Sequence, residues 1–212
     1  MRSKSRAYSE KDKQIKTDMI IEAAIKLYSQ QRQLHTVNAI AREAAIGKGT
    51  IYSYFSSKEE IYMEALVRSF SQWHLGVRNF ILDVSPLEQE LIEFLCRSLA
   101  NFTVFVDLVS ISSVILEENL DPEYLDSVIK ARKRESIRTS QLIASTYDKW
   151  SVDETIQNMR RFYTYGVGFW RECFPSGRVI ALDPLLYGNK EEQTEKFFRE
   201  ILVVSKLFWR IE

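Results

Sequence analysis

The sequence has few of the residues that carry chemistry in enzymes and metal sites. Its 212 residues include only two cysteines, Cys96 and Cys173, and two histidines, His35 and His74. The cysteines lack the close spacing of a metal site, and there is no plausible Ser-His-Asp or Cys-His arrangement, HExxH motif or phosphate-binding loop. We therefore expect no enzymatic activity, no bound metal and no cofactor.

The low cysteine content also bears on the compartment. Two cysteines without a recognisable secretory leader predict a reducing, cytoplasmic environment. Buried thiols behave as small hydrophobic side chains, which is the interpretation we favour for both. A redox-sensing pair is the alternative.

Proline and glycine are scarce as well, with four and seven residues. Apolar residues recur at helical spacing along most of the chain, and neither an alternating strand pattern nor an internal repeat is found. The predicted fold class is all-α, with about nine helices. We expect the main ones over 15–31, 58–82, 87–104, 123–150, 152–174 and 190–210, with a short helical piece ending near 118 and a loop over 175–188. Pro86 is expected in the first turn of the helix over 87–104, and Ser151 and Glu154 form a capping box at the start of the helix over 152–174. The expected inward stripe of the helix over 58–82 is Ile61, Ala65, Leu66, Phe70, Trp73 and Val77.

One apolar run, residues 98–116, approaches the length of a membrane span. It contains Asn101, Asp107 and several serines, and it lacks flanking aromatic belts and basic clusters. We interpret it as a pair of buried helices broken near Asp107, and we expect no membrane association.

The net charge is zero, but the charge is unevenly distributed. Residues 1–58 hold eleven Lys or Arg against five Asp or Glu, and the remainder holds eighteen against twenty-four. A basic end joined to an acidic remainder is typical of a nucleic-acid-binding module attached to another domain. We predict a DNA-binding domain over 1–60, in which 1–14 form a flexible basic arm, and a larger helical domain over 61–212.

Residues 36–62 have the pattern of two short helices joined by a tight turn and followed by a third helix. Thr36 precedes an apolar run that it can cap, and Ile51 gives the second short helix an inward face. Ser57 and Glu60 have the spacing of a capping box that begins the next helix. The pattern is that of a helix-turn-helix reading DNA.

At these residues the sequence resembles the DNA-binding domain of TetR-type transcriptional repressors, over roughly residues 17–65. The family string has the form T-hydrophobic-x-x-IA-x-x-AGVSKGT-hydrophobic-Y-x-Y/H-F-x-x-KEEL. The sequence departs from it at Ala45, where the family often has the turn glycine, and at Gly47, where it often has serine. It matches at Thr36, Ile40, Ala41, Ala44, Lys48, Gly49, Thr50, Tyr52, Tyr54, Phe55, Lys58, Glu59 and Glu60.

The resemblance implies where DNA is contacted. We expect Lys48 and Tyr52 to reach base edges, while other residues position the phosphate backbone. For Tyr54 the alternative is a core aromatic that supports the turn, and for Lys58 a solvated charge. The full set of candidate DNA-binding residues is Thr36, Lys48, Gly49, Thr50, Tyr52, Ser53, Tyr54 and Lys58.

The two helices expected over 152–174 and 190–210 are apolar nearly all round, so both sides must be buried. One side can pack on the body of the chain and the other on a second copy, with Gly166 and Gly168 allowing close approach. We predict a homodimer through these helices, as the resemblance also implies, and burial within one chain is the alternative. A twofold dimer fits a palindromic operator in double-stranded DNA.

A regulator of this type implies an effector pocket among the middle helices. Candidates are aromatic residues at helical spacing and one carboxylate within an apolar run. Plain core is the alternative for the aromatic residues, and a helix cap is the alternative for the carboxylate. We interpret the basic cluster over 130–138 as a solvated helix face. The candidate ligand-binding residues are Trp73, Phe102, Phe105, Asp107, Tyr147, Tyr163, Phe169 and Trp170.

Taken together, the sequence predicts a dimeric TetR-like transcriptional regulator that represses from a palindromic operator and is released by an unknown small-molecule effector. An activating role stays open. The alternative is a DNA-binding protein whose C-terminal domain binds a protein partner, which would need a filled core instead of a cavity.

Overall fold

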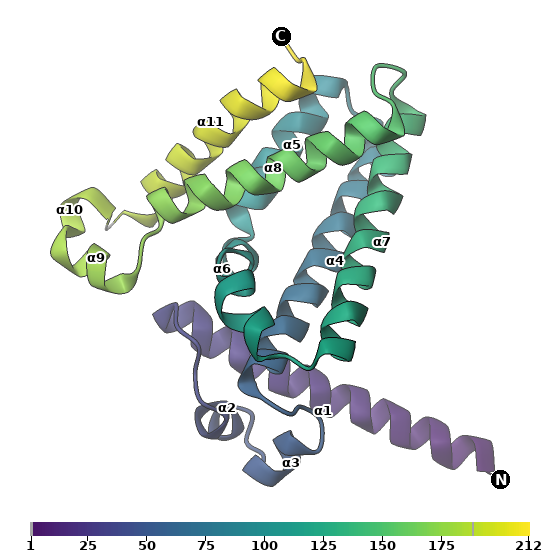
Figure 1. Cartoon of the computed structure of the whole chain (residues 1–212), viewed down its shortest axis with the longest axis vertical. Coiled ribbons are helices and arrows are strands. Elements are labelled where there is room, and N and C mark those ends of the chain that lie inside the picture. Colours follow the sequence, from purple (N-terminus) through teal and green to yellow (C-terminus); the bar gives the residue numbers. More distant parts are fainter. Residues whose placement is uncertain (1, 188) are drawn as a thin grey trace. The chain divides into compact units, whose positions relative to one another are not determined.

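The computed structural model describes residues 2–187 and 189–212, and helix dominates throughout them (Figure 1). Eleven α-helices and two short irregular helical turns follow one another, and these residues contain no strand. The predicted all-α fold is confirmed. The elements are α1 (Arg2–Gln31), α2 (Val37–Glu43), α3 (Lys48–Tyr52), α4 (Lys58–Val84), α5 (Glu88–Asn101), α6 (Thr103–Ile111), η1 (Ser112–Leu116), η2 (Glu117–Asn119), α7 (Pro122–Thr146), α8 (Val152–Cys173), α9 (Gly177–Leu182), α10 (Pro184–Tyr187) and α11 (Lys190–Trp209).

The chain divides into two compact units. The first comprises the residues up to Ala65 together with Ser112–Leu120, and the second comprises Leu66–Ile111 and Asp121–Glu212. Helix α4 runs without interruption through the residues where the division falls. The expected boundary after residue 60 stays a prediction about function, because compactness alone assigns no activity to either unit.

The first unit is built on small and branched apolar side chains. Ile20, Ala24, Ile40, Ile51 and Ile61, from four different helices, have no exposed surface. Helix α2 packs against α1, and α3 packs against α2. The core therefore fixes how α2 and α3 are held.

Helix α1 begins at Arg2, although the apolar stripe that predicted it begins only at Ile15. The backbone of the segment expected as a flexible arm is therefore helical. Residues 2–14 contain neither Pro nor Gly, so nothing in them stops the helix from extending toward the N-terminus. Apolar periodicity misses such an extension, because residues 2–14 have no apolar stripe to reveal it.

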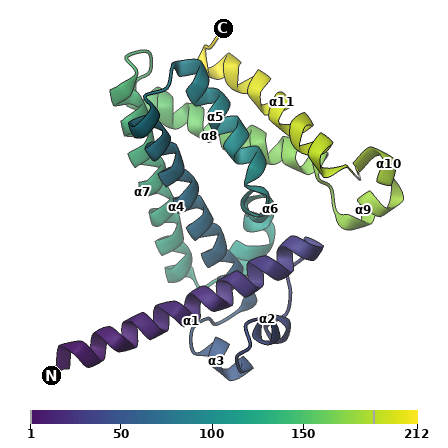
Figure 2. The same cartoon turned by 180° about the vertical axis from the view of Figure 1, so that it is seen from behind.

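The second unit has its core between α5, α8, α11 and the neighbouring faces of α4 and α7. Figures 1 and 2, which view the molecule from opposite sides, both show α8 and α11 running side by side and α4 alongside α7. The aromatic residues Trp73, Phe162, Trp170, Phe197 and Trp209 are all at most 3% exposed. The predicted inward stripe of α4 is confirmed at Ile61, Ala65, Leu66, Phe70, Trp73 and Val77, all of which are buried.

Three predicted boundaries were wrong. The break in the apolar run falls at Phe102, between α5 and α6, and Asp107 lies inside α6. Pro86 precedes the N-cap residue Leu87 and is not in the first turn. The expected loop over 175–188 contains α9 and α10, which are too short to show an apolar period.

The apolar run was interpreted as buried helices, and most of its large side chains in α5 and α6 are buried. Among the described residues, no single helix is long and apolar enough to cross a membrane. Only the bent pair formed by α5 and Thr103–Asn119 meets the criteria of length and composition.

Candidate DNA-binding segment and ligand cavity

Helix α2 begins at a side-chain cap. The hydroxyl oxygen of Thr36 accepts a hydrogen bond from the backbone N–H of Ala39 at 3.3 Å, as the sequence pattern predicts. The helix buries Ile40 and Ala41 and leaves Asn38 exposed. The cap thus fixes the start of the first short helix and holds Thr36 itself at the surface.

The turn after α2 has the hydrogen bonds of a Schellman motif. The N–H of Ile46 donates to the carbonyl of Ala41 at 3.0 Å, and the N–H of Ala45 donates to the carbonyl of Arg42 at 3.2 Å. Ala45 has a φ of 54°, in the left-handed region. This is the position that glycine usually takes, because a Cβ is strained there. The departure from the family string at Ala45 therefore falls on a strained residue.

Helix α3 begins after Gly47, which supplies no side-chain cap. Its φ of −71° and ψ of 143° lie in the extended region, which any residue can adopt. A Cβ at this position would meet only the hydroxyl of Thr50, at 3.6 Å. The backbone here therefore accepts a serine, and the missing hydroxyl is not a steric requirement.

The outer side of α3 carries the residues expected to read bases. Ile51 is fully buried, whereas Tyr52 is 51% exposed and Lys48 is exposed. The ammonium nitrogen of Lys48 lies 5.7 Å from the centre of the Tyr52 ring, a cation–π arrangement. The two side chains stand together at the surface, where a cation and a phenol can both reach a DNA groove.

Two of the candidate residues lie beyond the end of α3. Ser53 donates its hydroxyl hydrogen to the carbonyl of Gly49 at 3.2 Å, and Tyr54 is half-buried in the turn toward α4. Thr50, within α3, is also half-buried. Compared with Lys48 these three have less freedom to reach a base, and their placement fits backbone positioning.

The start of α4 is organised by the expected capping box. The Ser57 hydroxyl accepts from the N–H of Glu60 at 3.1 Å, while the Glu60 carboxylate accepts from the N–H of Ser56 at 2.6 Å. The return bond thus reaches one residue earlier than predicted. Lys58 is half-buried, and its ammonium nitrogen lies 3.7 Å from the Glu59 carboxylate.

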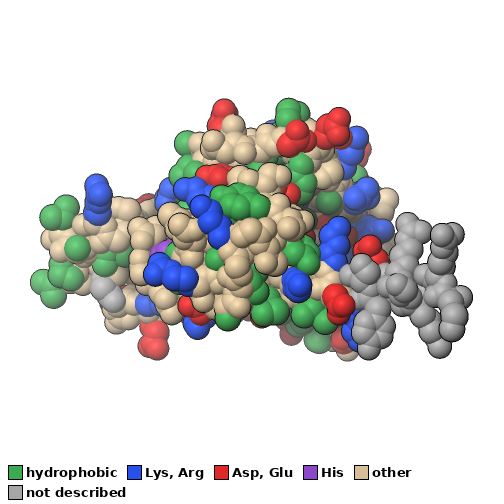
Figure 3. All heavy atoms as spheres, turned by 90° about the horizontal axis from the view of Figure 1, so that it is seen from below, with side chains coloured by type: hydrophobic (Ala, Val, Ile, Leu, Met, Phe, Trp, Pro, Cys, Tyr) green, Lys and Arg blue, Asp and Glu red, His purple; other side chains and the backbone are tan. Residues whose placement is uncertain are grey.

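The charges around α3 favour contact with a negatively charged molecule. Residues 44–58, which include α3, contain Lys48 and Lys58 and no acidic residue. Figure 3 shows Lys and Arg side chains, together with some Asp and Glu side chains, scattered over the face of the molecule seen from below. The surface of residues 44–58 attracts a polyanion and leaves hydroxyl, phenol and backbone N–H groups for directional contacts.

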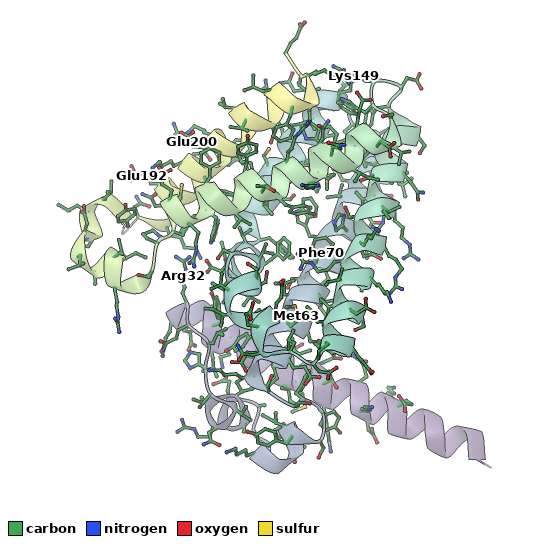
Figure 4. The ribbon with its side chains drawn as sticks, in the orientation of Figure 1. Arg32, Met63, Phe70, Lys149, Glu192 and Glu200 are labelled. Atoms are coloured by element: carbon green, nitrogen blue, oxygen red, sulfur yellow. The ribbon has the colours of Figure 1, made fainter. Side chains whose placement is uncertain are left out.

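The second unit holds a cavity of about 460 Å³ between α4, α6, α7 and α8. Figure 4 labels Phe70 in the space that these helices surround. Its wall combines aromatic and aliphatic side chains with hydroxyl and basic groups. The lining residues are Phe70, Val109, Ile129, Arg132, Lys133, Ser136, Ile137, Ile156, Arg160, Tyr163 and Thr164.

Of the eight candidate ligand-binding residues, Tyr163 alone lines this cavity. Phe105 borders a void of only about 10 Å³ beside it. Phe102 and Phe169 pack against the core as half-buried side chains. The basic residues Arg132 and Lys133, which the sequence placed on a solvated helix face, also line the cavity; Lys133 is exposed there and Arg132 is half-buried.

The other polar candidates are engaged within the core. The indole of Trp73 donates to Ser98 at 3.0 Å, and the hydroxyl of Tyr147 donates to the carbonyl of Pro86 at 2.8 Å. The indole of Trp170 donates to the carboxylate of Asp107 at 2.5 Å, and Asp107 is 4% exposed in the middle of α6. Asp107 therefore does not cap a helix, and its carboxyl group has a hydrogen-bond partner within the core.

A buried polar network lies behind Tyr163. The Tyr163 hydroxyl is 3.0 Å from Nε2 of His74, and Nδ1 of His74 is 2.9 Å from the Thr139 hydroxyl. Arg78 donates to the same Thr139 oxygen at 2.9 Å and to the Glu135 carboxylate at 2.8 Å. Burial, with a smaller contribution from Arg78, lowers the pKa of His74 to about 3, so the ring is neutral at physiological pH.

The paired helices α8 and α11 keep an exposed apolar face. Tyr165, Val203 and Leu207 are 48%, 62% and 75% exposed. The rings of Tyr165 and Phe208 stack across the two helices, with centres 6.2 Å apart. Complete burial of these helices within one chain, the alternative from the sequence, is therefore wrong.

The two glycines of α8 differ. A Cβ on Gly166 would lie 3.0 Å from side-chain atoms of Ile201 and Leu99, so this residue allows α8, α11 and α5 to pack closely within one chain. Gly168 is exposed, and a Cβ there would meet no atom within 4 Å. Only Gly168 is thus available for contact with another molecule.

Both cysteines are buried and unpaired. Burial raises the pKa of Cys96 to about 12, and its thiol lies 3.6 Å from the Ser205 hydroxyl to which it donates. A thiol in this state has very little reactive thiolate. The interpretation of Cys96 and Cys173 as small core side chains is consistent with this burial.

Residues 20–65 match the family described as bacterial regulatory proteins, tetR family. This match confirms the resemblance of the helix-turn-helix segment. A search of curated protein sequences finds no match to this chain.

Several solved structures are similar in fold. The fatty acid degradation regulator FadR from Bacillus halodurans has 16% identity and a TM-score of 0.53, covering 88% of this chain and 94% of its own. FadR from Bacillus subtilis in complex with stearoyl-CoA has 15% identity and a TM-score of 0.53, covering 87% and 96%. The TetR family regulator PfmR from Thermus thermophilus has 18% identity and a TM-score of 0.50, covering 86% and 96%. The chain has the fold of a TetR-family transcriptional regulator.

Proposed function

Because residues 20–65 belong to the tetR family of bacterial regulatory proteins, we propose that the protein is a transcriptional repressor that binds a palindromic operator as a dimer. The observation that carries the proposal is the exposed pair Lys48 and Tyr52 on α3. A lysine and a tyrosine on one short helix supply a donor for base acceptors and a ring for apolar contact. The residues around them supply backbone contacts that set the register.

Dimerisation is proposed through α8 and α11. Their apolar face, with Tyr165, Val203 and Leu207 exposed, would lose contact with water against the same face of a second copy. A twofold contact of this kind is self-complementary. It gives the operator two half-sites, each bound by one α3 helix.

The cavity supports control by a small molecule. Its volume of about 460 Å³ is within the range of small-ligand sites, and its wall is apolar with a few polar groups. The alternative, a C-terminal domain that serves only a protein partner, would favour a filled core. We infer that an effector in this cavity favours a state with low operator affinity, and that its binding is coupled to DNA release.

The proposal includes neither catalysis nor a cofactor, because binding alone accounts for repression and release. It places the protein in the cytoplasm, where a bacterial regulator meets chromosomal DNA. The reduced, buried cysteines are compatible with that compartment.

Selection of genomic DNA fragments bound by the purified protein tests the proposal. We expect recovered fragments to share a palindrome whose half-site centres are about one helical turn, or a multiple of it, apart. Footprinting should protect both halves. If the recovered fragments share no sequence and bind no more tightly than random DNA, the result argues against an operator-specific regulator.

A further inference from the structure

All the charged residues that line the cavity of the second unit are basic. Arg132, Lys133 and Arg160 line it, and no acidic residue is among the lining residues. Lys133 and Arg160 are exposed, and the Arg132 guanidinium lies 5.5 Å from the centre of the Phe70 ring. Cations beside an apolar wall stabilise a negative charge on a ligand and oppose a positive one.

The remaining wall is suited to a hydrocarbon chain. Val109, Ile129, Ile137 and Ile156 contribute aliphatic side chains, and Phe70 contributes a ring. Each methylene that such a wall removes from water strengthens the binding of a hydrocarbon chain. A ligand with one charged end and one apolar end would satisfy both parts of the cavity.

The network behind Tyr163 is compatible with either neutral tautomer of His74. Arg78 can only donate, so the Thr139 oxygen is the acceptor of that bond. With the proton on Nδ1, His74 donates to the Thr139 oxygen and accepts the Tyr163 hydrogen at Nε2. With the proton on Nε2, His74 accepts the Thr139 hydrogen at Nδ1 and donates to the Tyr163 oxygen.

The tautomer with the proton on Nε2 leaves the hydroxyl hydrogen of Tyr163 without an acceptor among the contacts of the described residues. The Tyr163 oxygen then accepts from His74, and the ring lies in the cavity wall. Burial keeps the pKa of His74 near 3, so the ring is neutral in either tautomer. A ligand in the cavity that accepts the Tyr163 hydrogen would select the tautomer with the proton on Nε2.

We propose that the cavity binds an amphipathic anion, an aliphatic chain with a carboxylate or phosphate head, whose head is held by Arg132, Lys133 and Arg160 and accepts the Tyr163 hydroxyl hydrogen. The inference rests on the proposed function in one respect, that this cavity is the effector site. It adds the chemical class of the effector and assigns specificity to a tyrosine that is polarised by Arg78, Thr139 and His74.

The test uses four C12 probes below their critical micelle concentrations: dodecanoate, dodecyl phosphate, dodecanol and dodecyltrimethylammonium. Isothermal titration with the full-length protein, without DNA, should give at least about tenfold tighter binding for an anion than for the alcohol. The two anions distinguish a carboxylate site from a phosphate site. Equal or tighter binding of the alcohol or the ammonium compound would overturn the proposal.

Variants locate the binding. Arg160→Gln and Lys133→Gln should each weaken anion binding by about tenfold, while Lys130→Gln on the same helix α7, outside the cavity, should have no effect. Tyr163→Phe should weaken the anions by about fivefold or more and leave dodecanol within about twofold. Thermal unfolding of each variant shows whether the fold persists. Unchanged anion affinity in folded Arg160→Gln, Lys133→Gln and Tyr163→Phe would contradict the assignment.

Operator binding distinguishes this inference from the proposed function. If the protein binds its operator and no anion binds, the ligand assignment fails and the regulator stands. If an anion binds in the cavity without changing operator affinity, the ligand chemistry stands and effector control fails.

Discussion

At the scale of single residues, the helix-turn-helix carries one strained position. Ala45 holds a left-handed φ of 54° at the end of α2, with both hydrogen bonds of the Schellman motif in place. A non-glycine residue in this conformation costs roughly 1 kcal/mol. This strain lies in the unit that we propose to bind DNA, at the turn between α2 and α3.

Replacing Ala45 by glycine should therefore raise the free energy of unfolding by about 1 kcal/mol, because glycine adopts this conformation without strain. Urea unfolding followed by circular dichroism measures it. The matched control is Ala39→Gly within α2, which should lower stability by about 1 kcal/mol. If both substitutions destabilise to the same degree, Ala45 is not in the left-handed conformation.

A second residue-scale prediction concerns pH. The folded-state pKa of His74 is about 3, below its ordinary value of 6.5, so the ring stays neutral in the fold while the unfolded chain takes up a proton. The contribution of the neutral His74 ring to the unfolding free energy is present above pH 6.5 and is lost as pH falls toward 3. Between pH 6.5 and 5.5 we expect a loss of about 1 kcal/mol in unfolding free energy. In His74→Gln this part of the pH slope should vanish, and an unchanged slope would refute the assignment.

At the scale of the element, the sequence predicted those features that depend only on residues close to one another in the chain. The Thr36 cap, the Ser151–Glu154 capping box and the buried stripe of α4 follow from neighbouring residues, and all are present. The direction of Arg132 and Lys133 does not follow from them. Their spacing on α7 is the same whether that face meets solvent or a cavity, and only packing against α4 and α8 decides. The same holds for Asp107, whose partner Trp170 is distant in sequence.

Helix α8 offers a paired test of packing. Gly168→Ala should raise the unfolding free energy by roughly 0.5–1 kcal/mol, because alanine favours helix and meets open space. Gly166→Ala should be less stable than Gly168→Ala by about 1 kcal/mol or more, because its Cβ crowds Ile201 and Leu99. Chemical denaturation of both at one protein concentration makes the comparison. Equal stabilities would show that α8 does not pack as closely as described.

At the scale of the whole molecule, the proposal requires two chains. The exposed face of α8 and α11 is the apolar surface that we assign to the second copy. A charge in its middle would be buried without a partner. The dimer is thus more sensitive to such a change than the fold of either chain.

Leu207→Glu should weaken dimerisation by at least about tenfold, because Leu207, which is 75% exposed in the single chain, would carry a charge into the interface. Leu182→Glu is the matched control, since Leu182 is 85% exposed on α9, outside the proposed contact. Light scattering over a dilution series gives the oligomeric state. A wild-type monomer, or a Leu207→Glu dimer as stable as the wild type, would contradict the proposed interface.

The proposed reading of DNA by α3 is tested by the affinity of three proteins, the wild type and two variants, for the selected operator at one salt concentration. Lys48→Ala and Tyr52→Ala should each bind at least about tenfold more weakly than the wild type, because each removes a base-edge contact worth about 1–3 kcal/mol. Light scattering should show that both variants remain folded dimers, since the two side chains are exposed. Unchanged operator affinity in both variants would contradict the assignment of α3 as the recognition helix.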